Sequence, residues 1–259
     1  MLPQADDLRL QAVWTASAPM RPLRAWSRDD LTRFKPVFAK ERDPFTGQIV
    51  RWKGVLVSDI IDKALESLPG EQRALVDLIV FRNAEGAVAT VPRSLVIKYP
   101  VLLAYEREGH ALAADTATYG SFFPVMPWSS KVGILNEELP LEKFIVPKLN
   151  QIELANYRER YPSLFLKRRT NPVAMRGEKL FVRNCVSCHA PSDPSRASFV
   201  EFFNGTKARV VASNFHPDIK GGLPKLNDLN RRSIESYFEA YQNEKGLETH
   251  KKISSQSSR

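Results

Sequence analysis

The stretch Gly177-Glu-Lys-Leu-Phe-Val-Arg-Asn-Cys185-Val-Ser-Cys188-His189 contains both cysteines of the sequence, spaced as C-x-x-C, with a histidine directly after the second. This spacing is the pattern for covalent attachment of haem c. Two thiols so placed can form thioethers with the two vinyl groups of a porphyrin, while the adjacent imidazole ligates the iron. The motif therefore predicts one covalent haem c, with Cys185 and Cys188 as anchors and His189 as the proximal ligand.

Three other uses of a C-x-x-C pair fit this sequence less well than haem attachment. A structural zinc site needs four ligands, and no second cysteine pair or His-x₃₋₅-His is present. A redox dithiol follows a strand-to-helix junction, whereas a helix is predicted to lead into Cys185. A disulfide across so short a loop would add little stability. Haem attachment therefore explains the motif best.

Two amphipathic helices are predicted around the motif. Gly177, Leu180, Phe181 and Val182 recur at helical spacing, so a helix delivers the cysteines at its C-terminal end. A second helix with aromatic residues on its face is predicted over residues 229–241. The C-terminal part of the chain is therefore expected to be all-α.

This arrangement resembles the class I cytochrome c family, in which a G-x-x-L-F helix crosses the C-terminal helix behind the haem. The resemblance implies that Gly177 lets the two backbones approach closely. It also implies that Phe181 meets Tyr237 or Tyr241. The alternative is that these aromatic side chains are ordinary core residues, and the same positions are compatible with it.

The sixth iron ligand departs from that family. Where the family often has G-G-M-P, this chain has Gly221-Gly-Leu-Pro224, and no methionine follows His189. The remaining nearby donor is His216, in Asn214-Phe-His-Pro217, where the proline favours an extended loop. His216 is therefore the candidate distal ligand, and the alternatives are a surface histidine or an open iron.

Composition limits the class of protein and its partners. The chain has 259 residues with 43% hydrophobic composition, enough for two modest cores. Its 38 Lys and Arg against 29 Asp and Glu give a net charge of +9. Such a balance suits an acidic redox protein partner or an anionic membrane surface. A nucleic-acid partner is not expected, because the cations are scattered and not interleaved with aromatic residues.

The predicted location follows from the haem. Covalent attachment takes place outside the cytoplasmic membrane, so the motif predicts a periplasmic protein. Residues 1–8 lack the basic and apolar regions of a signal peptide, so a removed or trimmed signal is expected. No apolar run reaches the ~18 residues that a membrane helix needs.

The first part of the chain alternates β-rich and helical patterns, which predicts a mixed α+β domain. A capped amphipathic helix is expected from Val57-Ser-Asp59 to Pro69-Gly70. The ranges expected to form strands are 8–14, 75–81, 88–91, 101–105 and 144–154.

The order of these patterns resembles the molybdopterin-binding domain of the sulfite-oxidase family. The likeness is carried by Trp52-Lys-Gly-Val55, residues 102–112, Tyr119-Gly120 to Pro127, and Ile152-Glu-Leu154. That family binds molybdenum partly through a cysteine, and no cysteine precedes Cys185 here. Phe123 takes the place where the family usually carries an arginine. We therefore expect the fold to be kept and the molybdenum cofactor to be absent.

The predicted organisation has four parts: a sulfite-oxidase-like domain at 1–156, a basic linker at 157–172, a cytochrome c domain at 173–250 and a disordered tail at 251–259. The expected function is single-electron transfer by a periplasmic c-type cytochrome, whose first domain docks a redox partner. The alternatives are a haem-based gas sensor, with Leu223 keeping the distal side open, and a molybdenum oxidoreductase with a fused cytochrome. An enzymatic activity and the oligomeric state stay open.

Overall fold

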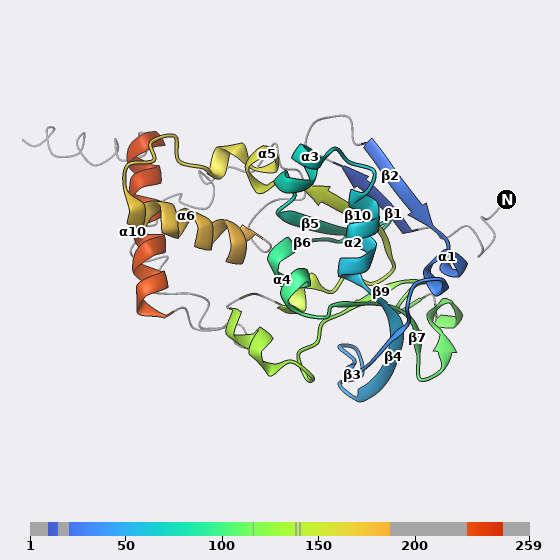
Figure 1. Cartoon of the computed structure of the whole chain (residues 1–259). Helices are drawn as coiled ribbons and strands as arrows, with labels where there is room; N and C mark the ends of the chain where they lie inside the picture. The colour runs from blue at the N-terminus through green and yellow to red at the C-terminus, as the bar shows by residue number, and fades with distance from the viewer. Residues whose placement is uncertain are drawn as a thin grey trace, which may run out of the picture. The chain divides into compact units, whose positions relative to one another are not determined.

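The chain folds as two compact units, unit 1 at Met1–Arg160 and unit 2 at Tyr161–Arg259 (Figure 1). The computed structural model describes residues 10–14, 21–115, 117–137, 139, 141–186 and 227–245. These residues form a mixed α+β structure with two sheets and a C-terminal helix pair. None of the helices in these ranges combines the length and apolar character needed to span a bilayer.

The first sheet of unit 1 has the strand order β2-β1-β10-β5-β6. The pair β1–β10 is parallel and the other neighbours are antiparallel. The parallel pair joins the first and last strands of the unit, so both ends of its chain are held in one sheet. In sheet order the strands are Arg21–Trp26, Leu10–Trp14, Leu149–Ala155, Leu78–Asn83 and Val88–Pro92.

The second sheet is antiparallel, with the order β3-β4-β7-β8 and with β9 paired to β7. Strands β4 and β7 approach so closely at Gly54 that a Cβ there would lie 2.0 Å from the Leu103 carbonyl oxygen. A glycine is therefore required at this crossing. The strands are Val37–Arg42, Ile49–Leu56, Leu102–Arg107, His110–Ala111 and Phe123–Val125.

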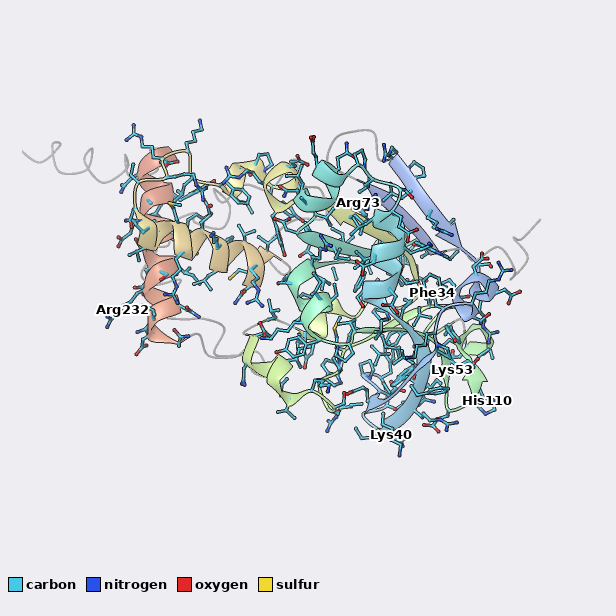
Figure 2. All side chains as sticks on the ribbon, viewed as in Figure 1. Phe34, Lys40, Lys53, Arg73, His110 and Arg232 are labelled. Carbon is cyan, nitrogen blue, oxygen red and sulfur yellow. The ribbon has the colours of Figure 1, made fainter. Side chains whose placement is uncertain are left out.

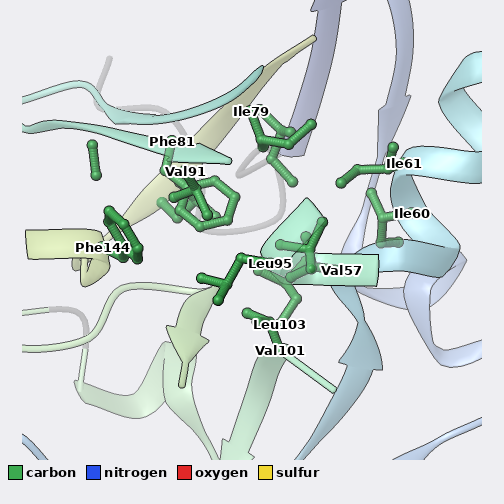
Figure 3. Packing of buried hydrophobic residues seen from close by; sticks show 14 of the residues in the cluster. Val57, Ile60, Ile61, Ile79, Phe81, Val91, Leu95, Val101, Leu103 and Phe144 are labelled. Atoms are coloured by element: carbon green, nitrogen blue, oxygen red, sulfur yellow. The ribbon is translucent and has the colours of Figure 1, made fainter. Parts of the chain in front are cut away.

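Helices cover the core of unit 1. The α-helices are α1 at Arg28–Thr32, α2 at Val57–Leu65, α3 at Gly70–Leu75, α4 at Arg93–Lys98 and α5 at Tyr157–Arg160. Three 3₁₀ turns lie at Leu112–Asp115, Val132–Glu137 and Leu141–Phe144. Figure 3 shows α2, α4 and strands of both sheets meeting in one apolar cluster. Its labelled members are Val57, Ile60, Ile61, Ile79, Phe81, Val91, Leu95, Val101, Leu103 and Phe144.

Most of the elements expected in unit 1 are confirmed, with corrections to three of them. Leu75 ends α3 and does not begin a strand, so β5 starts three residues later than expected. Helix α2 begins directly after Leu56 without a side-chain cap and ends at Leu65. Its expected capping by Ser58 and Asp59 and its expected end near Pro69-Gly70 are therefore wrong. Phe144 ends a 3₁₀ turn, and the expected final strand begins only at Leu149.

Unit 2 is described as two helices and the segment that precedes them. A 3₁₀ turn at Pro162–Leu164 leads to α6 at Pro172–Asn184, and α10 follows at Asp228–Lys245. The Asn171 side chain caps α6 by accepting the backbone N–H of Val173 at 2.9 Å. Proline at the first helical position suits this start, because an N–H at that position would have no partner within the helix. Both helices agree with the sequence pattern.

The expected linker at 157–172 contains α5 and the first 3₁₀ turn of unit 2, and the boundary between the units lies within it. The expected tail at 251–259 is outside the described residues.

Candidate functional site

The two helices of unit 2 cross at Gly177. A Cβ added there would lie 1.8 Å from the Ser233 carbonyl oxygen and 2.8 Å from Cβ of Tyr237. No side chain larger than hydrogen fits at this distance, so the glycine sets how closely α6 and α10 pack. The expected close approach of the backbones at Gly177 is thus confirmed.

Aromatic rings continue the contact beyond the crossing. The Phe181 ring centroid lies 5.7 Å from that of Tyr237 and 5.4 Å from that of Phe238, the latter edge to face. Aromatic pairs at these separations add roughly 0.5–1.5 kcal/mol to the burial of their surface. The expected contact of Phe181 with Tyr237 is confirmed, and Phe238 is an additional partner.

Cys185 follows the last residue of α6 and forms its C-cap. Its backbone N–H donates to the Phe181 carbonyl at 2.9 Å, and the residue is partly buried. The first cysteine of the motif is therefore held at the end of a packed helix. Cys188, His189 and His216, together with Leu223 of the expected distal loop, lie outside the described residues.

Asn184, the residue before Cys185, has a buried side-chain amide whose hydrogen bonds are not made within the described residues. The residue is 7% exposed, and in the described part of the chain neither Oδ1 nor Nδ2 has a hydrogen-bond partner. A buried polar group left unpaired costs about 1–3 kcal/mol, and such groups are often completed by a bound group that is not polypeptide. The buried amide of Asn184, next to Cys185, is therefore a group whose hydrogen bonds a bound haem would be in a position to complete.

Hydrogen bonds fasten the segment before α6 to the helix pair. The buried Glu178 carboxylate accepts the Leu166 backbone N–H at 2.7 Å and pairs with Arg169 at 2.9 Å. The Tyr237 hydroxyl donates to the Leu164 carbonyl. Burial raises the pKa of Tyr237 well above its usual value, so this hydroxyl remains a donor at neutral pH. The segment is therefore bound to both helices.

Unit 1 contains an aromatic cluster at the position compared with the sulfite-oxidase family. Phe123 is fully buried and stacks on Trp52, with centroids 5.5 Å apart and planes at 24°. Tyr119 meets both rings edge to face, at 5.8 Å from Trp52 and 5.4 Å from Phe123. Phe123 thus serves as a packing residue of the second sheet.

A buried ion pair lies beside this cluster. Asp43 accepts the Tyr119 hydroxyl at 2.6 Å and Nε of Arg107 at 2.8 Å. Burial alone would raise the pKa of Asp43, but the hydrogen bonds from Tyr119, the Phe45 backbone and Arg107 lower it overall. Burial, together with the bond to Asp43, raises the pKa of Tyr119 to about 12. The carboxylate and the phenol are thus held in fixed protonation states at neutral pH, which suits a structural network better than proton transfer.

The described residues contain no cluster of three or more His, Cys, Asp or Glu able to hold a metal ion. No protein-family model and no curated protein matches the sequence. The arguments for function therefore come from the motif and from the geometry around it.

The sequence alone does not indicate the role of two residues of this site. Glu178 reads as an exposed helical position, because its partners lie nine and twelve residues upstream in a segment without a helical or strand pattern. Asn184 gives no pattern of its own. Its position beside the first cysteine of the motif was the one available indication.

Proposed function

We propose that this chain is a periplasmic c-type cytochrome that transfers single electrons. The observation that carries the proposal is the C-x-x-C-H motif at the end of α6, a helix that crosses α10 at Gly177 and packs on it through Phe181. These contacts are what the resemblance to class I cytochrome c implies, and they support that fold for unit 2.

Each residue of the motif has a separate role in the proposal. The thiols of Cys185 and Cys188 anchor the haem, and the imidazole of His189 ligates the iron. When bound, the haem supplies a one-electron redox couple, while the chain sets its potential through ligands and burial. Helix α6 restricts the position of Cys185, which lowers the entropic cost of attachment.

Unit 1 acts in the proposal as a docking platform of sulfite-oxidase-like fold without molybdenum. The absence of a cysteine before Cys185 and the burial of Phe123 where the family has an arginine support this assignment. Elemental analysis of protein from its native source should give no molybdenum. One molybdenum per chain would favour the alternative hypothesis, a molybdenum oxidoreductase with a fused cytochrome.

Covalent haem is tested by producing the chain with the cytochrome c maturation machinery. Its colour should survive acid-acetone extraction, and a pyridine haemochrome assay should give one haem per chain. The double variant Cys185→Ala/Cys188→Ala should lose covalent haem, whereas Ser187→Ala, within the same motif, should keep it. Haem that extracts freely from the unaltered chain would refute the proposal.

His216 is the proposed sixth ligand. Imidazole stabilises ferric iron better than a thioether does, so bis-histidine ligation should give a low-spin spectrum and a lower potential than a His/Met pair. The variant His216→Ala should become high-spin and bind carbon monoxide when reduced. An unaltered spectrum would remove His216 from the ligand set.

A gas-binding function is the second candidate, and Leu223 in the expected position of the methionine favours it. Leucine cannot ligate iron, so the distal side would be apolar and open. Ready binding of carbon monoxide by the unaltered reduced protein would select this function over electron transfer.

A further inference from the structure

One face of the β3–β4 hairpin in unit 1 carries four cations and no acid. Side chains of a strand alternate between faces, and residues directly opposite share one. The register pairs Phe38 with Lys53, Lys40 with Arg51 and Arg42 with Ile49. These six residues, here called the basic hairpin face, therefore lie on one surface, on which Figure 2 labels Lys40 and Lys53.

The other face of the same hairpin is covered by the unit itself. Trp52 and Val50 lie in the aromatic cluster with Tyr119 and Phe123. Glu41, the acid of β3, is fully buried there and accepts the backbone N–H groups of Ser129 and Ser130 at 2.7 and 3.0 Å. Its charge therefore points away from the basic hairpin face.

Neighbouring acids neutralise only one end of this face. Lys53 pairs with Glu106 at 3.0 Å. The Glu108 carboxylate accepts the backbone N–H of Arg51 and not its guanidinium. Among the described residues no carboxylate is ion-paired with the side chains of Lys40, Arg42 or Arg51. Three unpaired cations thus stand side by side.

The arrangement works against stability. Lys40 and Arg51 are directly opposite, and like charges at such positions destabilise a strand pair. Edge strands do carry lysines that prevent sheet-to-sheet aggregation, and β3 is an edge strand. That protection does not account for Arg51 and Lys53, which belong to the interior strand β4.

Large apolar side chains are exposed on the same face. Phe38 is 59% exposed and Ile49 is 56% exposed. They lie at opposite ends of the charged row, so they do not form the continuous apolar patch that would enter a bilayer. Arginine forks with aromatic and aliphatic neighbours are typical of surfaces that bind carboxylates of another protein.

We propose that the basic hairpin face docks an acidic protein partner through Lys40, Arg42 and Arg51, with Phe38 and Ile49 as apolar contacts. The identification of this partner as a redox protein rests on the proposed function. The docking itself needs no haem.

The proposal is tested by binding to labelled polypeptides, with the holoprotein as the sample and its visible spectrum as a record of the haem. The probes are poly-glutamate and a glutamate–tyrosine copolymer. Lys40→Glu/Arg51→Glu should weaken binding of both by about tenfold or more at low salt. The control Lys143→Glu/Arg232→Glu makes the same change in net charge at exposed sites elsewhere and should weaken it far less.

Two single changes sharpen the test. Lys40→Glu alone places opposite charges across the strands, so it should raise the unfolding temperature while it lowers the affinity. The unaltered protein should bind the copolymer more tightly than poly-glutamate, because the tyrosines of the copolymer can contact the exposed Phe38 ring. Phe38→Ser should abolish this preference and leave poly-glutamate binding unaltered.

Three results would overturn the proposal: equal loss of binding in the control, unaltered binding in Lys40→Glu/Arg51→Glu, or tighter binding of duplex DNA or phosphatidylglycerol vesicles through the same residues. If the unaltered chain, produced with the cytochrome c maturation machinery, lacks covalent haem but still shows the expected binding, the proposed function is refuted and the docking surface stands.

Discussion

Gly177 shows how a single residue determines how closely two helices pack. Since a Cβ there would overlap the Ser233 carbonyl, Gly177→Ala must separate α6 from α10. Overpacking of this kind costs about 1–3 kcal/mol. We expect urea unfolding followed by the helical signal to show that loss in unit 2.

Gly70 offers the matched control for this substitution. It also belongs to a helix, as the first residue of α3, but nothing lies within 4 Å of a Cβ at that position. Gly70→Ala should therefore be neutral or slightly stabilising. An equal loss of stability in both variants would mean that the helix crossing does not limit unit 2.

Asp77 provides a pH-dependent prediction at the same scale. Burial raises the pKa of its carboxyl, although the Tyr157 backbone N–H, 2.8 Å away, lowers it in part. A raised pKa in the folded state means that the group costs stability as pH rises above 3.8, the value of an unperturbed Asp, and through the folded pKa.

Asp77→Asn keeps an acceptor for Tyr157 and removes the charge. The variant should therefore be more stable than the parent at pH 7.5, and the difference should shrink towards pH 4, as urea midpoints at several pH values would show. A difference that stays constant with pH would indicate that the charge of Asp77 is not its source.

Among the elements, the segment that precedes α6 depends on one carboxylate. Glu178→Ala would leave the Leu166 N–H and the Arg169 guanidinium without their partner, at a cost of about 1–3 kcal/mol. Glu178→Gln retains an acceptor for Leu166 and should recover part of the loss. If the two variants unfold at the same urea concentration, the ion pair with Arg169 carries the whole effect.

Element by element, the sequence predicted best where one periodicity covers a whole segment. Helices α6 and α10 follow from apolar spacing alone, and Asn171-Pro172 marks the start of the first. The sequence pattern places Leu75 in a strand because it continues an apolar run, whereas the helix that begins at Gly70 has no buried residue from which an amphipathic pattern could be recognised.

The residues of the candidate site also differ in how well the sequence alone predicts them. The haem motif is local and legible in the sequence, but Glu178, Asn184 and the basic hairpin face depend on distant contacts or strand register. Lys40 and Arg51 are eleven positions apart in the sequence, and only the pairing of β3 with β4 brings them together.

At the scale of the whole molecule, the two units differ in what stabilises them. Unit 1 has its own core, made by both sheets and helices α2 and α4. The described part of unit 2 is a helix pair with an aromatic contact, to which a covalent haem would add a large apolar surface. A group that binds only the folded state stabilises it. Loss of haem should therefore lower the stability of unit 2 alone.

The protein has separate reporters for this difference. All four tryptophans, at positions 14, 26, 52 and 128, belong to unit 1, so their fluorescence follows its unfolding. Circular dichroism reports the helices of both units, so it also follows the unfolding of unit 2. In Cys185→Ala/Cys188→Ala the fluorescence midpoint should stay at that of Ser187→Ala, while an earlier helical transition appears because unit 2 has lost its haem. Fluorescence and helical signal falling together at one lower temperature would instead show that the two units unfold as one, and that haem stabilises the whole chain.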